Sequence, residues 1–302
     1  MTHKAKKNLG QNFLKSKEAL FKICEASGLN DKDTVVEIGP GKGALTEKLL
    51  EKAKLVIAIE KDRDLMAILE EKFESEIKNK KLILLNEDIL EFDPLPLLRG
   101  GVGRGELIKN LPSFPSLVRR GGINPYKVIA NIPYNITGLI LRKFLSENPK
   151  PISMTLLVQK EVAERIVARD GKESILSLSV KAYGTPKYIM KVHKRFFSPA
   201  PKVDSAIIHI GDISNKHFKN KNEEDSFFQL IKAGFAHKRK VLRKNLEDLT
   251  YLEVGPALSA GRLPKIDEIF EKLNINPKAR AEDIKFEKWI EILGYLENKL
   301  YY

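Results

Sequence analysis

The sequence has one cysteine and no long apolar run. A single cysteine, Cys24, excludes an internal disulfide and is typical of proteins from a reducing cytosol. No apolar run approaches the roughly 20 residues that a membrane-spanning helix needs. The basic start, MTHKAKKNLGQNF, is not followed by the apolar region of a secretory signal. We therefore expect a cytoplasmic protein that has no contact with a membrane.

Acidic residues and metal-ligand patterns are also scarce. The 302 residues include 53 Lys and Arg against 40 Asp and Glu, so the formal net charge is +13. This balance favours a polyanionic partner such as nucleic acid, although excess lysine also serves solubility and charge alone leaves both readings open. His193, His209 and His237 have no metal-ligand spacing with the lone cysteine, and we expect no metal site.

Short β-rich runs alternate with helical stretches through the first two-thirds of the chain. This alternation predicts an α/β fold with a mostly parallel, doubly wound, Rossmann-like sheet, whose last two strands form an antiparallel edge. The predicted strands are residues 34–38, 55–59, 82–85, 127–130, 153–158, 177–183 and 205–210. The predicted helices between them are residues 43–52, 63–76, 138–146 and 160–168.

The pattern changes after about Gly211. A polar stretch, DISNKHFKNKNEED, predicts a linker, and residues 226–246, 263–273 and 281 to near the end are predicted to be helical. We therefore expect a first domain over residues 1–211 and a smaller helical domain over residues 212–302. Within the first, an insertion at about 94–124 contains the glycine-rich, basic segment 99–122, which predicts a mobile surface loop. A tolerated insertion is favoured over an RNA-contacting role for this loop.

The segment TVVEIGPGKGALT predicts a strand, a glycine turn and the start of a helix. Gly39, Gly41 and Gly43 allow a sharp turn and a close approach of the backbone to a ligand. The spacing is G-x-G-x-G, whereas dinucleotide-binding proteins have G-x-G-x-x-G, and this weakens a pyrophosphate interpretation. By itself, the turn indicates some nucleoside-containing cofactor.

Two acids narrow the choice of cofactor. Glu60 follows the second strand, where a carboxylate can accept hydrogen bonds from ribose hydroxyls. Asp88 follows the third strand, where it can accept a hydrogen bond from an adenine amino group. Ligands of doubly wound folds bind at these carboxyl ends of strands. Ribose and adenine acceptors without a phosphate clamp predict S-adenosylmethionine.

The fourth strand ends in Asn131-Ile132-Pro133-Tyr134. Pro133 presets the turn, Asn131 and a neighbouring backbone carbonyl can accept hydrogen bonds, and Tyr134 offers a flat face for a base. Two acceptors aimed at an adenine amine favour a pyramidal nitrogen whose lone pair can attack a methyl group. Catalysis would depend on positioning and oriented dipoles, with the base flipped out of its stack. The motif therefore predicts methyl transfer to an adenine amine.

With these motifs, the chain resembles the small-subunit branch of the ribosomal RNA adenine dimethyltransferase family. The resemblance is carried along nearly the whole chain by GQNFL, VVEIGPGKGALT, NIPYNIT, VQKEVAERI, FFSPAPKVDS, FAHKRKVLRKNL and ARAEDI. It implies that the protein transfers methyl groups from S-adenosylmethionine to two adjacent adenosines near the 3′ end of small-subunit rRNA. A monomer acting on the small ribosomal subunit or its precursor, with a role in ribosome biogenesis, is what the family leads us to expect.

The resemblance also assigns residues to roles. It implies that Asn12 and Leu14 close over the cofactor, and that Gly39, Glu60, Asp88 and Asn131 contact it. Gly41 is expected to contact the cofactor as part of the glycine turn. Asn131, Ile132, Pro133 and Tyr134 would hold the target adenine, and Phe197 would stack on the other face of the base. The 99–122 segment departs from the family, which usually keeps this connection short.

The stretch FAHKRKVLRKNL is expected to contact RNA phosphates. At helical spacing, Phe235, Leu242 and Leu246 share an inward side, and cations occupy the rest. No acid occurs before Glu247, whereas a solvated helix face usually mixes charges of both signs. The cations that we expect to bind RNA are Lys238, Arg239, Lys240, Arg243 and Lys244.

Three alternatives stay open on the sequence. A related family methylates large-subunit rRNA and shares the glycine turn and the N-x-P-Y type of motif, although GQNFL, FSPAPKVDSA and ARAEDI favour the small-subunit branch. A ribosome-assembly or transcription factor would keep the fold and lose the chemistry, but the residues for chemistry are present. A DNA adenine methyltransferase is disfavoured, because the resemblance over the whole chain is to rRNA enzymes.

Overall fold

The computed structural model of the chain describes residues 5–6, 9–93, 118–119, 122–123, 125–247 and 266–298. The chain forms two compact units, one comprising Met1–Ala163 with Lys187–Ile213 and the other Glu164–Pro186 with Ser214–Tyr302. The second unit thus includes a segment that we expected in the first domain. The functional division at residues 211 and 212 stays a prediction.

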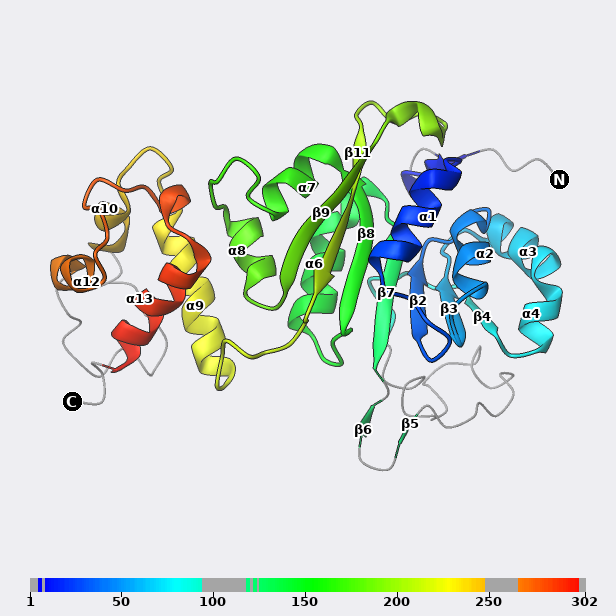
Figure 1. Ribbon diagram of the computed structural model, residues 1–302, viewed down its shortest axis with the longest axis horizontal. Helices are drawn as coiled ribbons and strands as arrows, with labels where there is room; N and C mark the ends of the chain where they lie inside the picture. Colours follow the sequence, from blue (N-terminus) through cyan, green and yellow to red (C-terminus); the bar gives the residue numbers. More distant parts are fainter. Residues whose placement is uncertain are drawn as a thin grey trace. The chain divides into compact units, whose positions relative to one another are not determined.

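The first unit is built on a seven-stranded sheet with the order β4-β3-β2-β7-β8-β11-β9 (Figure 1). Strands β4, β3, β2, β7 and β8 are parallel, and β11 runs antiparallel to β8. This confirms the mostly parallel, Rossmann-like fold. Of the two strands predicted to form an antiparallel edge, residues 205–210 correspond to β11, which runs antiparallel to β8. The strands are β2 (Thr34–Ile38), β3 (Leu55–Ile59), β4 (Leu82–Leu85), β7 (Tyr126–Asn131), β8 (Ser153–Gln159), β9 (Thr185–Val192) and β11 (Ser205–Gly211).

The register of the parallel strands decides where the functional residues meet. Ile38 of β2 pairs with Ile59 of β3 and with Ala130 of β7, and Ile59 pairs with Leu85 of β4. These four residues therefore form one row across the sheet. The next residue on each strand lies at the same carboxyl-terminal edge, and these residues are Gly39, Glu60, Asn86 and Asn131. The fold thus brings the glycine turn, an acid and the amide motif together.

The helices of the first unit begin where side chains cap them. Ser16 accepts a hydrogen bond from the Ala19 amide at the start of α1, and Asp62 accepts one from the Asp64 amide at the start of α3. The face of β2 that carries Val35 packs into a core with residues of α1 and α2. The helices are α1 (Lys17–Ala26), α2 (Ala44–Leu50), α3 (Arg63–Lys72), α4 (Glu74–Lys78) and α6 (Thr137–Ser146), and α7 (Lys160–Ile166) continues into the second unit.

The predicted strand 177–183 is wrong, because this segment is the helix α8 (Ile175–Lys181). The alternation of SLSVKAY resembles a strand, but Ser174 and Ser177 form a capping box that starts a helix. The strand at the outer side of β11 is β9, which was not predicted from the sequence. Strand β9 lies at the sheet edge and contains Pro186, which an edge strand tolerates.

The second unit is helical, as predicted, but its basic segment is not one helix. Helix α9 (Lys221–Gly234) ends before residues 235–241, and α10 (Leu242–Glu247) follows them. Gly234, the last residue of α9, packs closely against α13 (Phe286–Asn298), because a Cβ there would lie 2.4 Å from the Trp289 ring. The Asn245 side-chain amide also donates to the Gly234 and His237 carbonyls. The unit is completed by α8, α12 (Ile266–Lys272), the 3-10 turn η6 (Ala281–Asp283) and α13 (Phe286–Asn298).

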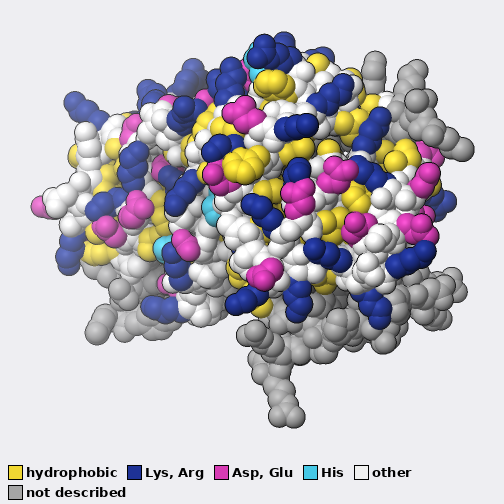
Figure 2. All heavy atoms as spheres, turned by 45° about the vertical axis from the view of Figure 1, so that its right-hand side comes forward, with side chains coloured by type: hydrophobic (Ala, Val, Ile, Leu, Met, Phe, Trp, Pro, Cys, Tyr) yellow, Lys and Arg dark blue, Asp and Glu magenta, His cyan; other side chains and the backbone are white. Residues whose placement is uncertain are grey.

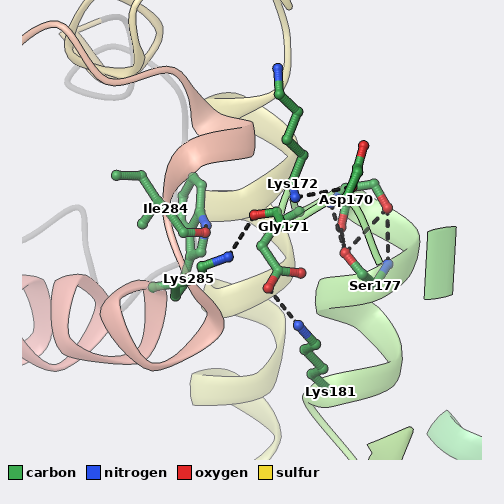
Figure 3. A network of polar contacts seen from close by, with 10 residues as sticks. Asp170, Gly171, Lys172, Ser177, Lys181, Ile284 and Lys285 are labelled. Carbon is green, nitrogen blue, oxygen red and sulfur yellow. Dashed lines mark hydrogen bonds and ion pairs between the residues drawn. The ribbon is translucent and has the colours of Figure 1, made fainter. Parts of the chain in front are cut away.

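A polar network fastens the loop before α8 to the ARAEDI segment (Figure 3). The Lys285 ammonium donates to the Gly171 carbonyl, and Lys172 pairs with Glu282. The Glu173 amide donates to the Glu282 carbonyl at 2.7 Å. These contacts explain why residues 164–186 belong to the helical unit.

Within the described parts of the chain, no helix is long and apolar enough to cross a membrane. The predicted mobile loop at 99–122 lies almost wholly outside the described residues. Its described part is a two-stranded sheet of β5 (Val118–Arg119) and β6 (Gly122–Ile123).

Candidate functional site

A cavity of about 1270 Å³ opens at the carboxyl-terminal edge of the sheet in the first unit. It is lined by the residues predicted to bind the cofactor and by those predicted to hold the target base. These are Asn12, Leu14, Gly39, Gly41, Glu60, Asp88, Asn131, Ile132, Pro133 and Tyr134. The structure therefore brings together a set whose members lie up to 122 positions apart in the sequence.

The glycine turn requires glycine at each of its three positions. Gly39, Gly41 and Gly43 have φ angles of 63°, 60° and 76°, a region that other residues rarely adopt. The Gly39 amide donates to the Ile59 carbonyl at 2.9 Å, which joins the turn to β3. A Cβ on Gly43 would lie 2.5 Å from the Phe73 ring. The turn is therefore a close-packed backbone surface beside the cavity.

Glu60 is held by backbone donors on both carboxylate oxygens. Its Oε2 accepts from the Gly41 amide at 3.1 Å, and its Oε1 accepts from the Asp62 amide at 2.9 Å. Burial raises the pKa of Glu60, and these backbone hydrogen bonds oppose the rise. The carboxylate is thus fixed in orientation beside the glycine turn, where it can accept from a diol.

Asp88 follows β4 and lines the same cavity. Lys61 donates to its Oδ2 at 2.6 Å, and the Leu90 amide donates to its Oδ1 at 3.0 Å. The Lys61 hydrogen bond lowers the pKa of Asp88, with the Leu90 amide contributing in the same direction. Asp88 is therefore a charged acceptor at neutral pH.

Residues 9–15 form an N-terminal strap that packs against the glycine turn through Phe13 and Gly41. Its strand β1 (Phe13–Leu14) pairs antiparallel with β10 (Phe197–Ser198). The Gln11 side-chain amide donates to Asp62 at 2.8 Å, and Lys6 forms an ion pair with the same carboxylate. Gln11, Phe13 and Asp62 are not among the site residues predicted from the sequence. Asp62 could have been found as an acid at the start of a helix, two residues after Glu60.

The strap also orients Asn131. The Asn131 side-chain Nδ2 donates to the Asn12 main-chain carbonyl at 3.0 Å. Because a carbonyl can only accept, this contact decides which end of the amide is nitrogen. The Oδ1 of Asn131 is the end left to accept a hydrogen bond from a substrate amine.

The residues after Asn131 are rigid and partly buried. Ile132 is 1% exposed, and Pro133 has a φ of −59°. The Tyr134 hydroxyl lies 2.5 Å from the Ser205 Oγ, and burial raises the pKa of Tyr134. The ring is thus held at the cavity wall as a neutral aromatic group.

The structure does not bring Phe197 to the cavity. The side chain is 4% exposed and packs in the core, so stacking on a base would require it to leave that core. Its proposed stacking role stays a prediction.

The predicted RNA-binding cations lie in the second unit and fall into two groups. Lys238, Arg239 and Lys240 are exposed in the turn between α9 and α10, and Lys244 is exposed on α10. Arg243 instead pairs with Asp267 at 2.8 Å and with Glu247 at 3.3 Å. Across the face drawn in Figure 2, Lys and Arg side chains are spread among acidic ones.

The cavity suits a nucleoside-containing cofactor. Carboxylates line it where a ribose and an adenine would bind, and the close-packed glycine turn admits a ligand against its backbone. Among the described residues, no group of three or more His, Cys, Asp or Glu could hold a metal ion.

Comparisons with known proteins identify the family of this chain. A model of the family described as "Ribosomal RNA adenine dimethylase" matches residues 2–296. Ribosomal RNA small subunit methyltransferase A from Fusobacterium nucleatum is 39% identical over 301 residues, covering 99% of this chain and 100% of that protein. The protein of the same name from Dehalococcoides mccartyi is 41% identical, covering 98% of this chain and 90% of that protein.

Solved structures confirm the fold. A dimethyladenosine transferase from Plasmodium falciparum has a TM-score of 0.73 and 26% identity, covering 95% of this chain and 98% of that one. The 23S rRNA methyltransferase ErmE has a TM-score of 0.71 at 22% identity, covering 95% and 100%, which supports the fold alone. With a family match over nearly its whole length and such similar relatives, the chain belongs to the ribosomal RNA adenine dimethylase family.

Proposed function

We propose that this chain dimethylates the exocyclic amines of two adjacent adenosines near the 3′ end of small-subunit rRNA, and so acts in ribosome biogenesis. The family makes it an enzyme that depends on S-adenosylmethionine. One observation carries the proposal. Asn131 lines the cavity, and its side-chain nitrogen donates to the Asn12 carbonyl, so its side-chain oxygen is left to accept. An acceptor is thereby presented where the glycine turn and two acids can hold a nucleoside.

The cofactor, when bound, supplies a methyl group on a positively charged sulfur. Glu60, fixed by two backbone amides, accepts hydrogen bonds from the ribose hydroxyls. Asp88, kept charged by Lys61, accepts from the adenine amino group. Asn12 and Leu14 belong to the strap that covers this binding site, and Gly39 and Gly41 provide the backbone against which the ligand lies.

The target adenine is held by the motif at the end of β7. Asn131 Oδ1 and a backbone carbonyl beside it accept the two amine hydrogens, and Pro133 keeps this segment extended. Tyr134 provides the stacking face, and its hydroxyl is anchored by Ser205. The protein groups around the attacking nitrogen are neutral, so the rate enhancement of methyl transfer arises from positioning and from oriented dipoles.

The RNA strand is bound through phosphate contacts in the helical unit. Lys238, Arg239, Lys240 and Lys244 are exposed there and available to phosphates. Arg243 contributes less, because its guanidinium is engaged by Asp267 and Glu247. The protein acts in the cytoplasm as a monomer on the small ribosomal subunit or its precursor.

The main alternative is methylation of large-subunit rRNA. Relatives that are 39% and 41% identical to this chain are named as small-subunit enzymes, and this favours the small-subunit assignment. The similarity to the 23S rRNA methyltransferase ErmE extends to the fold alone.

A transfer assay separates the two assignments. The protein is incubated with methyl-labelled cofactor and either unmethylated small subunits or large subunits, and the labelled nucleotides are mapped. We expect label on two adjacent adenosines near the 3′ end of small-subunit rRNA. Label confined to large-subunit rRNA would assign the chain to the other branch.

A further inference from the structure

Asp62 is a buried acid that is not among the residues lining the cavity. It lies two residues after Glu60, and its side chain is fully buried. It caps helix α3, because its Oδ1 accepts a hydrogen bond from the Asp64 amide at 3.1 Å. A helix cap needs one side-chain acceptor, and a neutral serine or asparagine would supply it without burying a charge. The second carboxylate oxygen of Asp62 therefore needs another explanation.

That second oxygen holds the N-terminal strap. The Asp62 Oδ2 accepts from the Gln11 Nε2 at 2.8 Å, and the Lys6 ammonium lies 2.6 Å from Oδ1. The Gln11 Oε1 in turn accepts from the Lys6 main-chain amide at 2.8 Å. Both ends of the Gln11 side-chain amide are engaged, so its orientation is fixed. The hydrogen bond between Gln11 and Asp62, called the Asp62–Gln11 link below, thus ties the strap to the start of α3.

The Asp62–Gln11 link joins two residues of the proposed site. On one side, the Asp62 amide donates to the Glu60 Oε1 at 2.9 Å. On the other side, Gln11 precedes Asn12, whose carbonyl accepts from the Asn131 Nδ2 at 3.0 Å. The acid that is placed at the ribose and the amide that is placed at the target amine are therefore connected through one buried carboxylate.

We propose that Asp62 is a positioning residue for methyl transfer, an inference that rests on the proposed function. By holding Gln11, Asp62 fixes the main chain of the strap at Asn12. The Asn12 carbonyl then keeps the Asn131 Oδ1 turned toward the target amine. Because Asp62 lies outside the cavity lining, it acts on the reaction through these residues. A small displacement of a group at the reacting centre can lower the rate by about a hundredfold.

The Asp62–Gln11 link can be broken without removing the helix cap. In Asp62→Asn, Oδ1 keeps its contacts with the Asp64 amide and Lys6, whereas an NH₂ group that can only donate replaces the oxygen that faces Gln11. We expect kcat at saturating cofactor to fall by about tenfold to a hundredfold, with the KM for small-subunit rRNA nearly unchanged. A wild-type kcat in Asp62→Asn would overturn the proposal.

A second substitution restores the link with the opposite polarity. When Asp62→Asn is combined with Gln11→Glu, the carboxylate and the amide exchange places, and net charge and side-chain size stay as in wild type. Gln11→Glu alone is expected to lower kcat, because two carboxylates then face each other. The double variant should recover most of the lost kcat, which is the coupling that a double-mutant cycle measures. A double variant no faster than Asp62→Asn alone would contradict the role of the link.

Asp64→Asn is the matched control. Asp64 lies in the same helical turn and pairs with the same Lys6 ammonium at 2.7 Å, but its side chain is 66% exposed. The substitution removes the same charge as Asp62→Asn and leaves the Asp62–Gln11 link in place. We expect kcat close to that of wild type. A loss as large as that of Asp62→Asn would show that charge near Lys6 sets the rate, and the proposal would be wrong.

The Asn131 side-chain amide gives a readout that needs no methyl transfer. In the NMR spectrum of protein with isotope-labelled asparagine, its Nδ2 signal is assigned by its absence in Asn131→Ala. Asp62→Asn should shift this signal, the double variant should return it toward the wild-type position, and Asp64→Asn should leave it in place. An unshifted signal in Asp62→Asn would overturn the proposal. If wild type transferred no methyl group to small-subunit rRNA and the signal still shifted, the proposed function would fail while the connection from Asp62 to Asn131 held.

Discussion

The Phe13 ring lies directly against Gly41, so the N-terminal strap and the glycine turn form one packed surface. A methyl group on Gly41 would be 3.0 Å from two carbons of that ring. The Lys42 ammonium lies 5.2 Å from the centre of the same ring. Closure of the strap therefore depends on the absence of a side chain at position 41.

Replacing Gly41 by alanine tests this contact. We expect Gly41→Ala to lose stability through its positive φ and to lose cofactor affinity through displacement of Phe13. The control is Gly28→Ala, which also has a positive φ, of 55°, but has nothing within 4 Å of the added methyl group. The control should cost about 1–2 kcal/mol of unfolding free energy and keep full cofactor affinity. Identical effects of the two substitutions on affinity would show that the Phe13 contact is irrelevant.

Stability should depend on pH through Glu37. Its pKa is raised from 4.5 to about 8 in the folded protein. Between these values the folded state keeps a proton that the unfolded state has lost, so stability falls as pH rises through this window. Urea unfolding of the ligand-free protein from about pH 5 to 8 should show a steeper fall for wild type than for Glu37→Gln. Equal slopes would mean that the pKa of Glu37 is not raised.

The exposed basic turn should control the salt dependence of RNA binding. Replacing Lys238, Arg239 and Lys240 together by alanine should reduce the slope of log affinity against log salt by about 2 to 3, because each phosphate that is no longer neutralised lowers the slope by roughly 0.7–0.9. Filter binding of the rRNA hairpin at several salt concentrations measures this slope.

Arg243→Ala is the comparison for the basic turn. Because Arg243 is already paired with Asp267 and Glu247, its removal should leave the slope nearly unchanged and lower stability slightly. If Arg243→Ala changed the salt slope by as much as one third of the change in the triple variant, Arg243 would bind phosphate like the residues of the basic turn, and this prediction would be wrong.

The strands around the site were predictable because their burial is complete. Strands β2 and β3 are buried at every position, and such short continuous apolar runs followed by glycine or acid indicate parallel strands. Their common carboxyl-terminal edge then follows from the fold class, which is why Glu60, Asp88 and Asn131 could be placed together from the sequence.

Other features depended on contacts that the sequence does not display. The strap residues Gln11 and Phe13 matter because of Asp62 and Gly41, which are distant in sequence and adjacent in space. Local periodicity indicated one long helix where two exist, and the Asn245 side chain that donates to the Gly234 and His237 carbonyls between them is distant in the sequence pattern. The alternation in residues 177–183 similarly concealed a helix whose start is set by serine caps.

The central claim is that Asn131 accepts the target amine, and one kinetic measurement tests it most directly. Single-turnover methyl transfer to small-subunit rRNA is compared for wild type and Asn131→Ala, with cofactor and RNA affinities measured on the same preparations. Loss of one preorganised hydrogen-bonding group at a reacting centre typically costs about a hundredfold to a thousandfold in rate. We predict a loss of at least this size, with RNA affinity nearly intact. Transfer at close to the wild-type rate in Asn131→Ala would contradict the account.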